Sequence, residues 1–196
     1  MTRILFVCTG NTCRSPMAEA MLKDMAQREG LRIEVRSAGV STIDGLAISG
    51  HAAQTLREKR VEHHGASRSI SGEAVDWADL ILTMTSGHKR GLLQWYPEAV
   101  DKTHTLKEFA HQNESAVADI EELERLYSEM HLKQALGQKL TAEERAKLLE
   151  LESRIPSMDI VDPFGGTLDM YRSCANEIEV GLQKLLEKLK NSETHY

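Results

Sequence analysis

A short loop near the N-terminus, residues 8–15, constrains the fold of this chain more than any other feature. Its sequence is Cys-Thr-Gly-Asn-Thr-Cys-Arg-Ser. The apolar residues 4–7 before it predict a buried strand, and Pro16 directly after it has the fixed φ that favours the first turn of a helix. Residues 8–15 are therefore expected to connect a strand to a helix.

The spacing of Cys8 and Arg14 in this loop is typical of a site that surrounds a tetrahedral oxyanion. Backbone N–H groups of such a loop point inward, and the helix N-terminus adds partial positive charge. Arg14 can hold two oxygens with its planar fork, while Cys8 as a thiolate would attack phosphorus. A chance match of Cys and Arg is the alternative, but the neighbouring strand, Gly, Asn, Ser and Pro all agree with the loop. We expect Cys8 and Arg14 to be catalytic, and the following residues to bind substrate: Thr9, Gly10, Asn11, Thr12, Cys13 and Ser15.

Composition limits the class of protein. The 196 residues suit one domain, and a net charge of −6 argues against nucleic acid as a partner. No apolar stretch reaches transmembrane length and the N-terminus lacks signal-peptide anatomy, so we expect a cytoplasmic protein that does not bind membranes. Three cysteines predict no disulfide framework, and eight scattered histidines predict no metal site or other cofactor. The oligomeric state stays open.

Strand and helix patterns alternate along the chain. Strands are expected over residues 3–8, 32–37, 79–84 and 102–106, and helices over 16–28, 49–59, 71–77, 85–95 and from near Thr167. Ser49, Ser71 and Thr85 are candidate helix caps. This order predicts an α/β fold: a doubly wound four-stranded parallel sheet with helices on both faces. Ligands bind such sheets beyond the C-terminal strand ends, where residues 8–15 fall.

One region interrupts this alternation. Residues of about 111–156 are strongly charged and helical in pattern, and Thr141 and Glu144 have capping-box spacing. We interpret them as an inserted helical hairpin within a single domain of residues 1–196. A structural arm and a lid or docking surface both stay open as its role. Two apolar stripes are expected, the first at Ile120, Leu123, Leu126 and Tyr127, and the second at Ala146, Leu149 and Ser153.

A cysteine nucleophile also needs a proton donor for the leaving group. Asp162 is the candidate, because the apolar residues 160–161 anchor it, Pro163 stiffens the chain after it, and two Gly allow a close turn. The same carboxyl group could then activate the water that hydrolyses phosphocysteine. The alternative is that Asp162 only opens a turn before the last helix.

These segments together resemble the low-molecular-weight protein tyrosine phosphatase family. The resemblance covers the N-terminal loop and helix, residues 37–39, the strand at 79–84 and the Asp162-Pro163 loop. It implies that Cys8 is the nucleophile, Arg14 the phosphate clamp and Asp162 the general acid. It further implies that Asn11 braces the loop and that Ser15 hydrogen-bonds the Cys8 thiolate.

The resemblance leaves two roles open for Cys13. This residue is either a small packing residue under the loop or the partner of Cys8 in a reversible disulfide that protects the nucleophile.

Two departures from the tyrosine-specific pattern indicate a particular branch. Thr12 stands where those members usually have an aliphatic residue, and Phe164-Gly165 follow the Asp-Pro where they have tyrosines. Residues 40–49 also contain no aromatic ring, although a phosphotyrosine slot needs flanking rings. The sequence resembles the protein arginine phosphatases of Gram-positive bacteria, which implies phosphorylated proteins as substrates and a Thr12 hydroxyl that favours the guanidinium phosphate.

Three other functions compete with this one. A tyrosine phosphatase is the nearest alternative. A thiol-linked arsenate reductase would need two further cysteines close together downstream, where the chain has only Cys174. A phosphoprotein-binding module without activity would have lost a catalytic group, whereas Cys8, Arg14 and Asp162 are all present.

Overall fold

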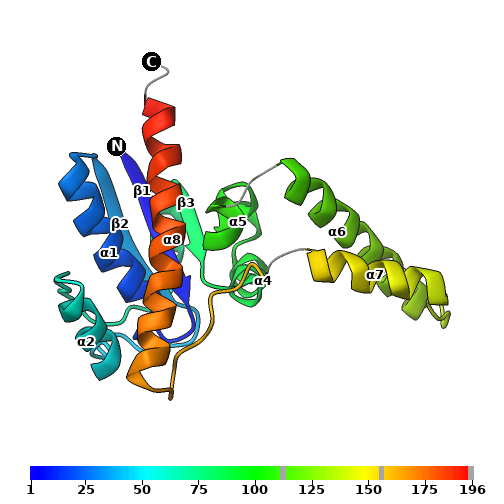
Figure 1. The fold of residues 1–196 in the computed structure, drawn as a ribbon, viewed down its shortest axis with the longest axis horizontal. Coiled ribbons are helices and arrows are strands. Elements are labelled where there is room, and N and C mark those ends of the chain that lie inside the picture. The colour runs from blue at the N-terminus through cyan, green and yellow to red at the C-terminus, as the bar shows by residue number, and fades with distance from the viewer. Residues whose placement is uncertain (111–113, 155–156, 194–196) are drawn as a thin grey trace. The chain divides into compact units, whose positions relative to one another are not determined.

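The computed structural model describes residues 1–110, 114–154 and 157–193. The chain divides into two compact units, one made of Met1–Ala110 with Met158–Tyr196 and the other of His111–Ser157. Figure 1 shows the elements of both units in order of sequence. The organisation as one domain carrying an insertion at about 111–156 stays a prediction.

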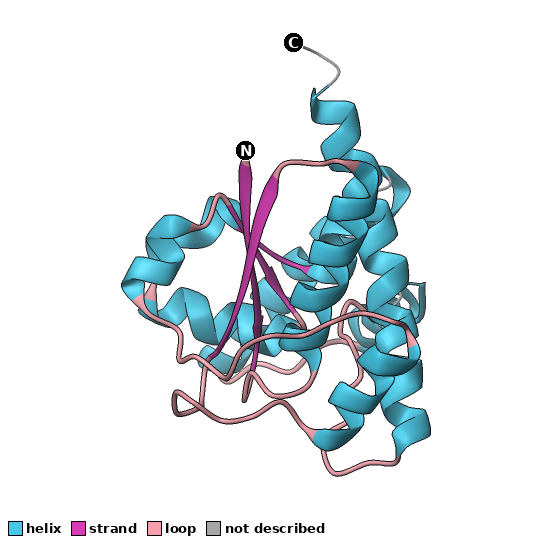
Figure 2. Cartoon of the chain, turned by 90° about the vertical axis from the view of Figure 1, so that its left-hand side faces the viewer, coloured by secondary structure: helices cyan, strands magenta, loops and turns pink. Residues whose placement is uncertain are grey.

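A four-stranded parallel sheet forms the centre of the first unit (Figure 2). The strand order is β2-β1-β3-β4, and β1 pairs with both β2 and β3. At the C-terminal ends of the strands, Cys8 lies opposite Gly39 and Val7 opposite Thr83. The strands are β1 (Thr2–Cys8), β2 (Ile33–Gly39), β3 (Leu80–Thr83) and β4 (Thr103–Thr105).

Alternation along β1 divides the core into two clusters, because successive side chains of a strand point to opposite faces. Ile4 and Phe6 are buried with helices α1 (Arg14–Glu29), α2 (Gly50–Glu58) and α8 (Leu168–Glu193). Leu5 and Val7 are buried on the other face with α3 (Gly72–Trp77) and α4 (Ser86–Trp95). Helices cover both faces, and the predicted doubly wound α/β sheet is confirmed.

Several predicted helix ends are confirmed by hydrogen bonds. The hydroxyl groups of Ser49, Ser71 and Thr85 each accept from the backbone N–H three residues later. Gly30 ends α1 in the left-handed region, with φ 68°. A helix cap is encoded within one turn of sequence, which explains why it can be predicted locally.

Other boundaries differ from the prediction. Helix α1 begins at Arg14 rather than residue 16, and β2 continues to Gly39 rather than ending at residue 37. The predicted strand at 102–106 is shortened, because Thr105 and Glu108 form a reciprocal capping box, with two bonds of 3.0 Å, that starts helix α5 (Leu106–Ala110). The 3-10 helix η1 (Pro97–Lys102) was not predicted.

The second unit is a helical hairpin, α6 (Glu114–Ala135) and α7 (Ala142–Arg154). The predicted capping box is confirmed: Thr141 N donates to Glu144 Oε2 at 2.9 Å, and Glu144 N donates to Thr141 Oγ1 at 3.2 Å. Leu126 and Leu151 are buried in this unit.

The second predicted stripe of the hairpin was wrong. Ala146 and Leu149 are exposed, and α7 buries Leu151 instead. The side chains of Ile120 and Ser153 lie outside the described residues. None of the helices described in either unit is long and apolar enough to cross a membrane.

Candidate active site

The predicted loop lies at the C-terminal edge of the sheet, between β1 and α1. A cavity of about 270 Å³ opens there. It brings together most of the predicted site residues, including Asp162 from a segment far along the chain. Its lining residues are Cys8, Thr9, Gly10, Thr12, Cys13, Arg14, Ser41, Asp162 and Phe164.

Cys8 lines this cavity and is 2% exposed, and its sulfur lies between two hydrogen-bonding groups. Ser15 Oγ is 3.0 Å from Cys8 Sγ, and Asn11 N donates to the same sulfur at 3.3 Å. With the Ser15 hydroxyl as donor, both groups stabilise a thiolate. Helix α1 begins at Arg14, so its first N–H groups are part of the loop and can bind an anion.

Asn11 and Ser15 form the back of the loop rather than the wall of the cavity. Asn11 Nδ2 donates to Ser15 Oγ at 2.9 Å and to Ser37 Oγ at 2.8 Å, and Asn11 Oδ1 accepts from Arg68 N at 2.8 Å. These bonds hold the backbone of Asn11 at φ 53°, a left-handed conformation that Asn tolerates better than most residues. Ser37 Oγ in turn donates to Glu19 Oε2 at 2.6 Å.

The end of β2 supports the loop through backbone contacts. Val40 N donates to Cys8 O and Ser41 N donates to Thr9 O, both at 3.0 Å. A Cβ at Gly39 would lie 2.6 Å from Thr9 O and 3.1 Å from Asn11 N. Only glycine lets the strand and the loop approach this closely.

Arg14 is 4% exposed and faces the cavity from the start of α1. Its Nη1 donates to Ile160 O at 3.2 Å, and its Nη2 donates to Asp162 Oδ2 at 2.8 Å. Its Nε is buried and has no hydrogen-bond partner among the described residues. A buried guanidinium with an unused donor is suited to an anion, because an unpaired buried donor is costly.

The geometry of Asp162 is compatible with both roles that the sequence left open, the catalytic one and the turn. Its Oδ1 accepts from Phe164 N at 3.1 Å, as in an Asx turn, and its Oδ2 faces Arg14. The segment is anchored by Ile160, which is 1% exposed and donates from its N to Met84 O at 2.7 Å, just beyond β3. The carboxyl group, half exposed, can exchange protons with a leaving group or a water.

Cys13 is buried, and its sulfur lies 3.3 Å from the hydroxyl of Tyr171 on α8. Cys13 also lines the cavity to which Cys8 belongs. Cys174, also on α8, is buried as a packing residue, and burial raises the pKa of its thiol to about 12.

His88 is a residue near the site that sequence reasoning missed. Its Nε2 lies 2.8 Å from Thr9 Oγ1, and its Nδ1 lies 2.9 Å from Thr85 Oγ1. Burial, followed by the positive charge of Arg14, lowers the pKa of His88 to about 4. The candidate cap at Thr85, three residues before it, was the only signal in the sequence. Likewise, no local pattern linked Glu19 or Arg68 to the loop.

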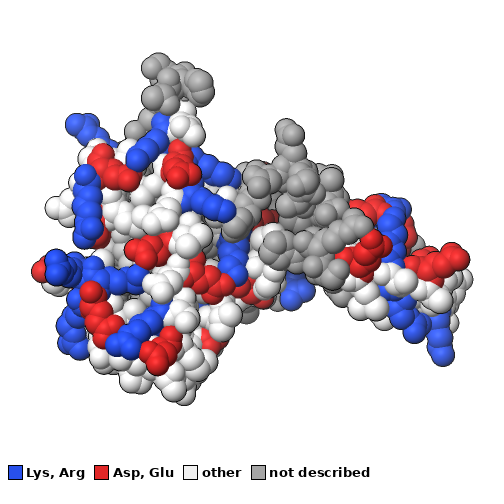
Figure 3. All heavy atoms as spheres, viewed as in Figure 1, with Lys and Arg blue, Asp and Glu red and all other residues white. Residues whose placement is uncertain are grey.

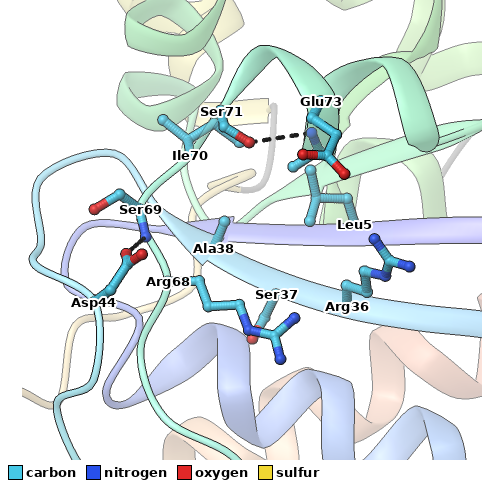
Figure 4. Close-up of a pocket in the computed structure, with 11 residues that line it drawn as sticks. Leu5, Arg36, Ser37, Ala38, Asp44, Arg68, Ser69, Ile70, Ser71 and Glu73 are labelled. Atoms are coloured by element: carbon cyan, nitrogen blue, oxygen red, sulfur yellow. Dashed lines mark hydrogen bonds between the residues drawn. The ribbon is translucent and has the colours of Figure 1, made fainter.

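A second cavity, of about 330 Å³, lies beside β2 on the face covered by α3 (Figure 4). Arg36 and Arg68 line it, and the Arg36 guanidinium stacks on the Trp77 ring at 4.1 Å. It has no lining residue in common with the cavity at Cys8. Acidic and basic side chains are interspersed on the face of the first unit seen in Figure 3.

Across the residues that the structure describes, no cluster of His, Cys, Asp and Glu could hold a metal ion.

Comparison with known proteins gives consistent results. The family model for low molecular weight phosphotyrosine protein phosphatase matches residues 3–136. A protein-arginine-phosphatase of Geobacillus stearothermophilus is 37% identical, with 97% of this chain and 98% of that protein covered. A protein-arginine-phosphatase of Bacillus subtilis is 34% identical, with 95% and 96% covered. A solved arginine phosphatase from Geobacillus stearothermophilus superposes with a TM-score of 0.72 at 36% identity, covering 100% of this chain and 98% of that one.

Proposed function

Because the chain belongs to the low molecular weight phosphotyrosine protein phosphatase family, we propose that it hydrolyses phosphoarginine in proteins through a phosphocysteine on Cys8. Membership in the family makes it a cysteine-dependent protein phosphatase. One observation carries the proposed chemistry: Cys8, Arg14 and Asp162 line one small cavity.

In the first step the Cys8 thiolate attacks phosphorus and the bond from phosphorus to the guanidinium nitrogen breaks. Arg14 and the loop N–H groups hold the phosphoryl oxygens as their charge shifts in the transition state. Asp162 donates its proton to the departing nitrogen, so arginine leaves with its guanidinium charge and the phosphoryl group stays on sulfur. The proton matters because a deprotonated guanidine nitrogen is a poor leaving group.

In the second step a water attacks the phosphocysteine from the position that the leaving group has vacated. Asp162, now ionised, accepts the proton of that water. The bond from sulfur to phosphorus breaks, inorganic phosphate is released, and Cys8 returns to the thiolate. Ser15 Oγ and Asn11 N lie 3.0 and 3.3 Å from the sulfur and stabilise it as the leaving group.

The wall of the cavity supports arginine as the substrate residue. Thr12 and Ser41, which both carry hydroxyl groups, line the cavity, and the carboxyl group of Asp162 can hydrogen-bond a flat guanidinium group. The similarity to two arginine phosphatases over nearly the whole chain agrees with this choice. Tyrosine is the second candidate, because Phe164 is 75% exposed at the cavity and its ring could cover one face of a phenol.

Thr12→Ile tests the substrate assignment. The substitution keeps a β-branched side chain, so the loop should keep its backbone while losing a polar wall. We expect the preference for phosphoarginine over phosphotyrosine in one peptide sequence to fall by about ten- to two-hundred-fold in kcat/KM. Cys8→Ser is the control for the nucleophile, and it should bind phosphate without turnover. A wild-type preference for phosphotyrosine, or an unchanged ratio, would favour the second candidate.

We further propose that the protein acts in the cytoplasm on phosphorylated proteins. We also propose that Cys13 forms a reversible disulfide with Cys8 under oxidation. The burial of both thiols at one cavity supports this pairing, although the Cys13 side chain must first leave Tyr171.

A further inference from the structure

The imidazole of His88 is 8% exposed and lies at the start of α4, next to the loop that follows β1. Both of its ring nitrogens are within hydrogen-bond distance of threonine hydroxyl groups, Thr9 on one side and Thr85 on the other. A buried histidine bonded on both sides cannot move without breaking one of these contacts. It therefore connects α4 to the residue that directly follows Cys8.

The bonds around Thr85 assign the direction of this connection. Thr85 Oγ1 already accepts from His88 N at 3.1 Å, so its own hydrogen is available for His88 Nδ1. With Nδ1 as the acceptor, we assign the hydrogen of a neutral ring to Nε2, which lies 2.8 Å from Thr9 Oγ1 and is then the donor of that bond. Thr83 Oγ1 on β3 donates to the backbone Thr85 O at 3.0 Å, which ties the backbone of Thr85 to the end of the strand.

Thr9 is consequently held from two sides. Ser41 N, after β2, donates to Thr9 O at 3.0 Å, and the His88 ring, after β3, hydrogen-bonds Thr9 Oγ1. Its side chain lines the cavity at Cys8 and also a groove next to Arg14. The contact with Ser41 alone would allow the Thr9 peptide to tilt, whereas two contacts on opposite sides fix it.

We propose that His88 is a positioning residue: its neutral imidazole fixes the Cys8 side of the anion loop through the hydroxyl group of Thr9. The inference rests on the proposed phosphatase function but does not depend on which phosphorylated residue is the substrate. Donors aimed at the phosphoryl oxygens act best when they need no rearrangement during the reaction. A loosened Thr9 should therefore weaken both anion binding and turnover.

Two substitutions of His88 separate its two contacts. In His88→Asn the amide can replace Nδ1 and keep the contact with Thr85, but it is too short to reach Thr9. In His88→Gln the longer side chain can place an N–H near the position of Nε2 and keep the contact with Thr9. Thr9→Val removes the hydroxyl group with little change of shape, and because Thr9 is exposed we expect this variant to fold as wild type.

The assay is hydrolysis of p-nitrophenyl phosphate, with inorganic phosphate as a competitive inhibitor, so that no result depends on arginine specificity. We expect His88→Asn and Thr9→Val each to lower kcat/KM by roughly ten-fold and to raise the inhibition constant of phosphate in parallel. The double variant should be no worse than either single one, since both remove the same contact. His88→Gln should recover most of the activity. His104→Asn, at a half-buried histidine on β4, is the matched control and should behave as wild type.

Three results would overturn the proposal. The first is wild-type kinetics for folded His88→Asn. The second is equal impairment of the Asn and Gln variants, which would mean that the ring only packs. The third is a double variant whose loss of kcat/KM equals the product of the losses in His88→Asn and Thr9→Val, which would mean that the two residues act separately. If His88→Asn does not melt cooperatively, the variant Thr9→Val alone tests the proposal. Wild-type kinetics for Thr9→Val would then reject it. Absence of any turnover by wild type would instead contradict the proposed function.

Discussion

Gly39→Ala should damage the anion loop from a position outside it. The new Cβ would lie 2.6 Å from Thr9 O and 3.1 Å from Asn11 N, and both are backbone atoms that cannot rotate away. The end of β2 or the loop must therefore shift by several tenths of an ångström. Overpacking of this kind costs about 1–3 kcal/mol in the free energy of unfolding.

The effect of Gly39→Ala on activity should exceed its effect on stability. Asn11 N donates to the Cys8 sulfur, and Thr9 follows Cys8 directly, so the displaced atoms belong to the site itself. Small misplacement of reacting groups costs on the order of ten- to a hundred-fold in rate, and we expect a loss of kcat/KM in that range.

The assay for this variant combines steady-state kinetics with urea unfolding. Gly50→Ala is the matched control, because a Cβ there would meet nothing within 4 Å, at the first residue of α2. It should leave kcat/KM unchanged and not reduce stability. If Gly39→Ala keeps kcat/KM within two-fold of wild type, the close approach of strand and loop is not what holds the site, and the argument fails.

Three further predictions concern single groups of the site. Asp162→Asn should lower kcat on phosphoarginine by about two to four orders of magnitude and much less on substrates with good leaving groups; an equal loss on both would indicate a structural role. His88 has a pKa of about 4 in the folded protein, compared with 6.5 in the unfolded chain, so between these pH values the unfolded chain binds more protons. The free energy of unfolding, measured with urea, should therefore fall as the pH drops from 6.5 to 4. The decline due to this group is at most about 1.4 kcal/mol per pH unit, and it should be missing in His88→Gln. Cys13→Ser should keep basal activity but not recover with reductant after mild peroxide, whereas equal recovery with wild type would leave Cys13 a packing residue.

The local parts of this fold and site could be predicted from sequence. The loop at residues 8–15 and the caps at Ser49, Ser71 and Thr85 each depend on residues within one or two turns of the chain. Alternation of strands and helices then predicted the sheet, because parallel strands require crossover helices. The capping box at Thr105 could also have been found by the same rule, and it explains the strand that was predicted too long.

The contacts that brace the loop could not be predicted in this way. Arg68 N bonds Asn11, and His88 bonds Thr9, across 57 and 79 residues respectively. Such pairs are brought together only by strand order. The side of α7 that is buried was equally undetermined, since Leu149 and Leu151 are both apolar and only packing against α6 selects one of them.

The most direct test of the account is a competition within one molecule. A peptide that carries one phosphoarginine and one phosphotyrosine in equivalent surroundings is incubated with the wild-type protein, and phosphorus NMR follows both resonances and free phosphate. We predict that the phosphoarginine signal disappears before the phosphotyrosine signal. With the Cys8→Ser variant, the enzymatic loss of the phosphoarginine signal should be absent. Loss of the phosphotyrosine signal first, or loss of the phosphoarginine signal at the same rate with Cys8→Ser, would contradict the account.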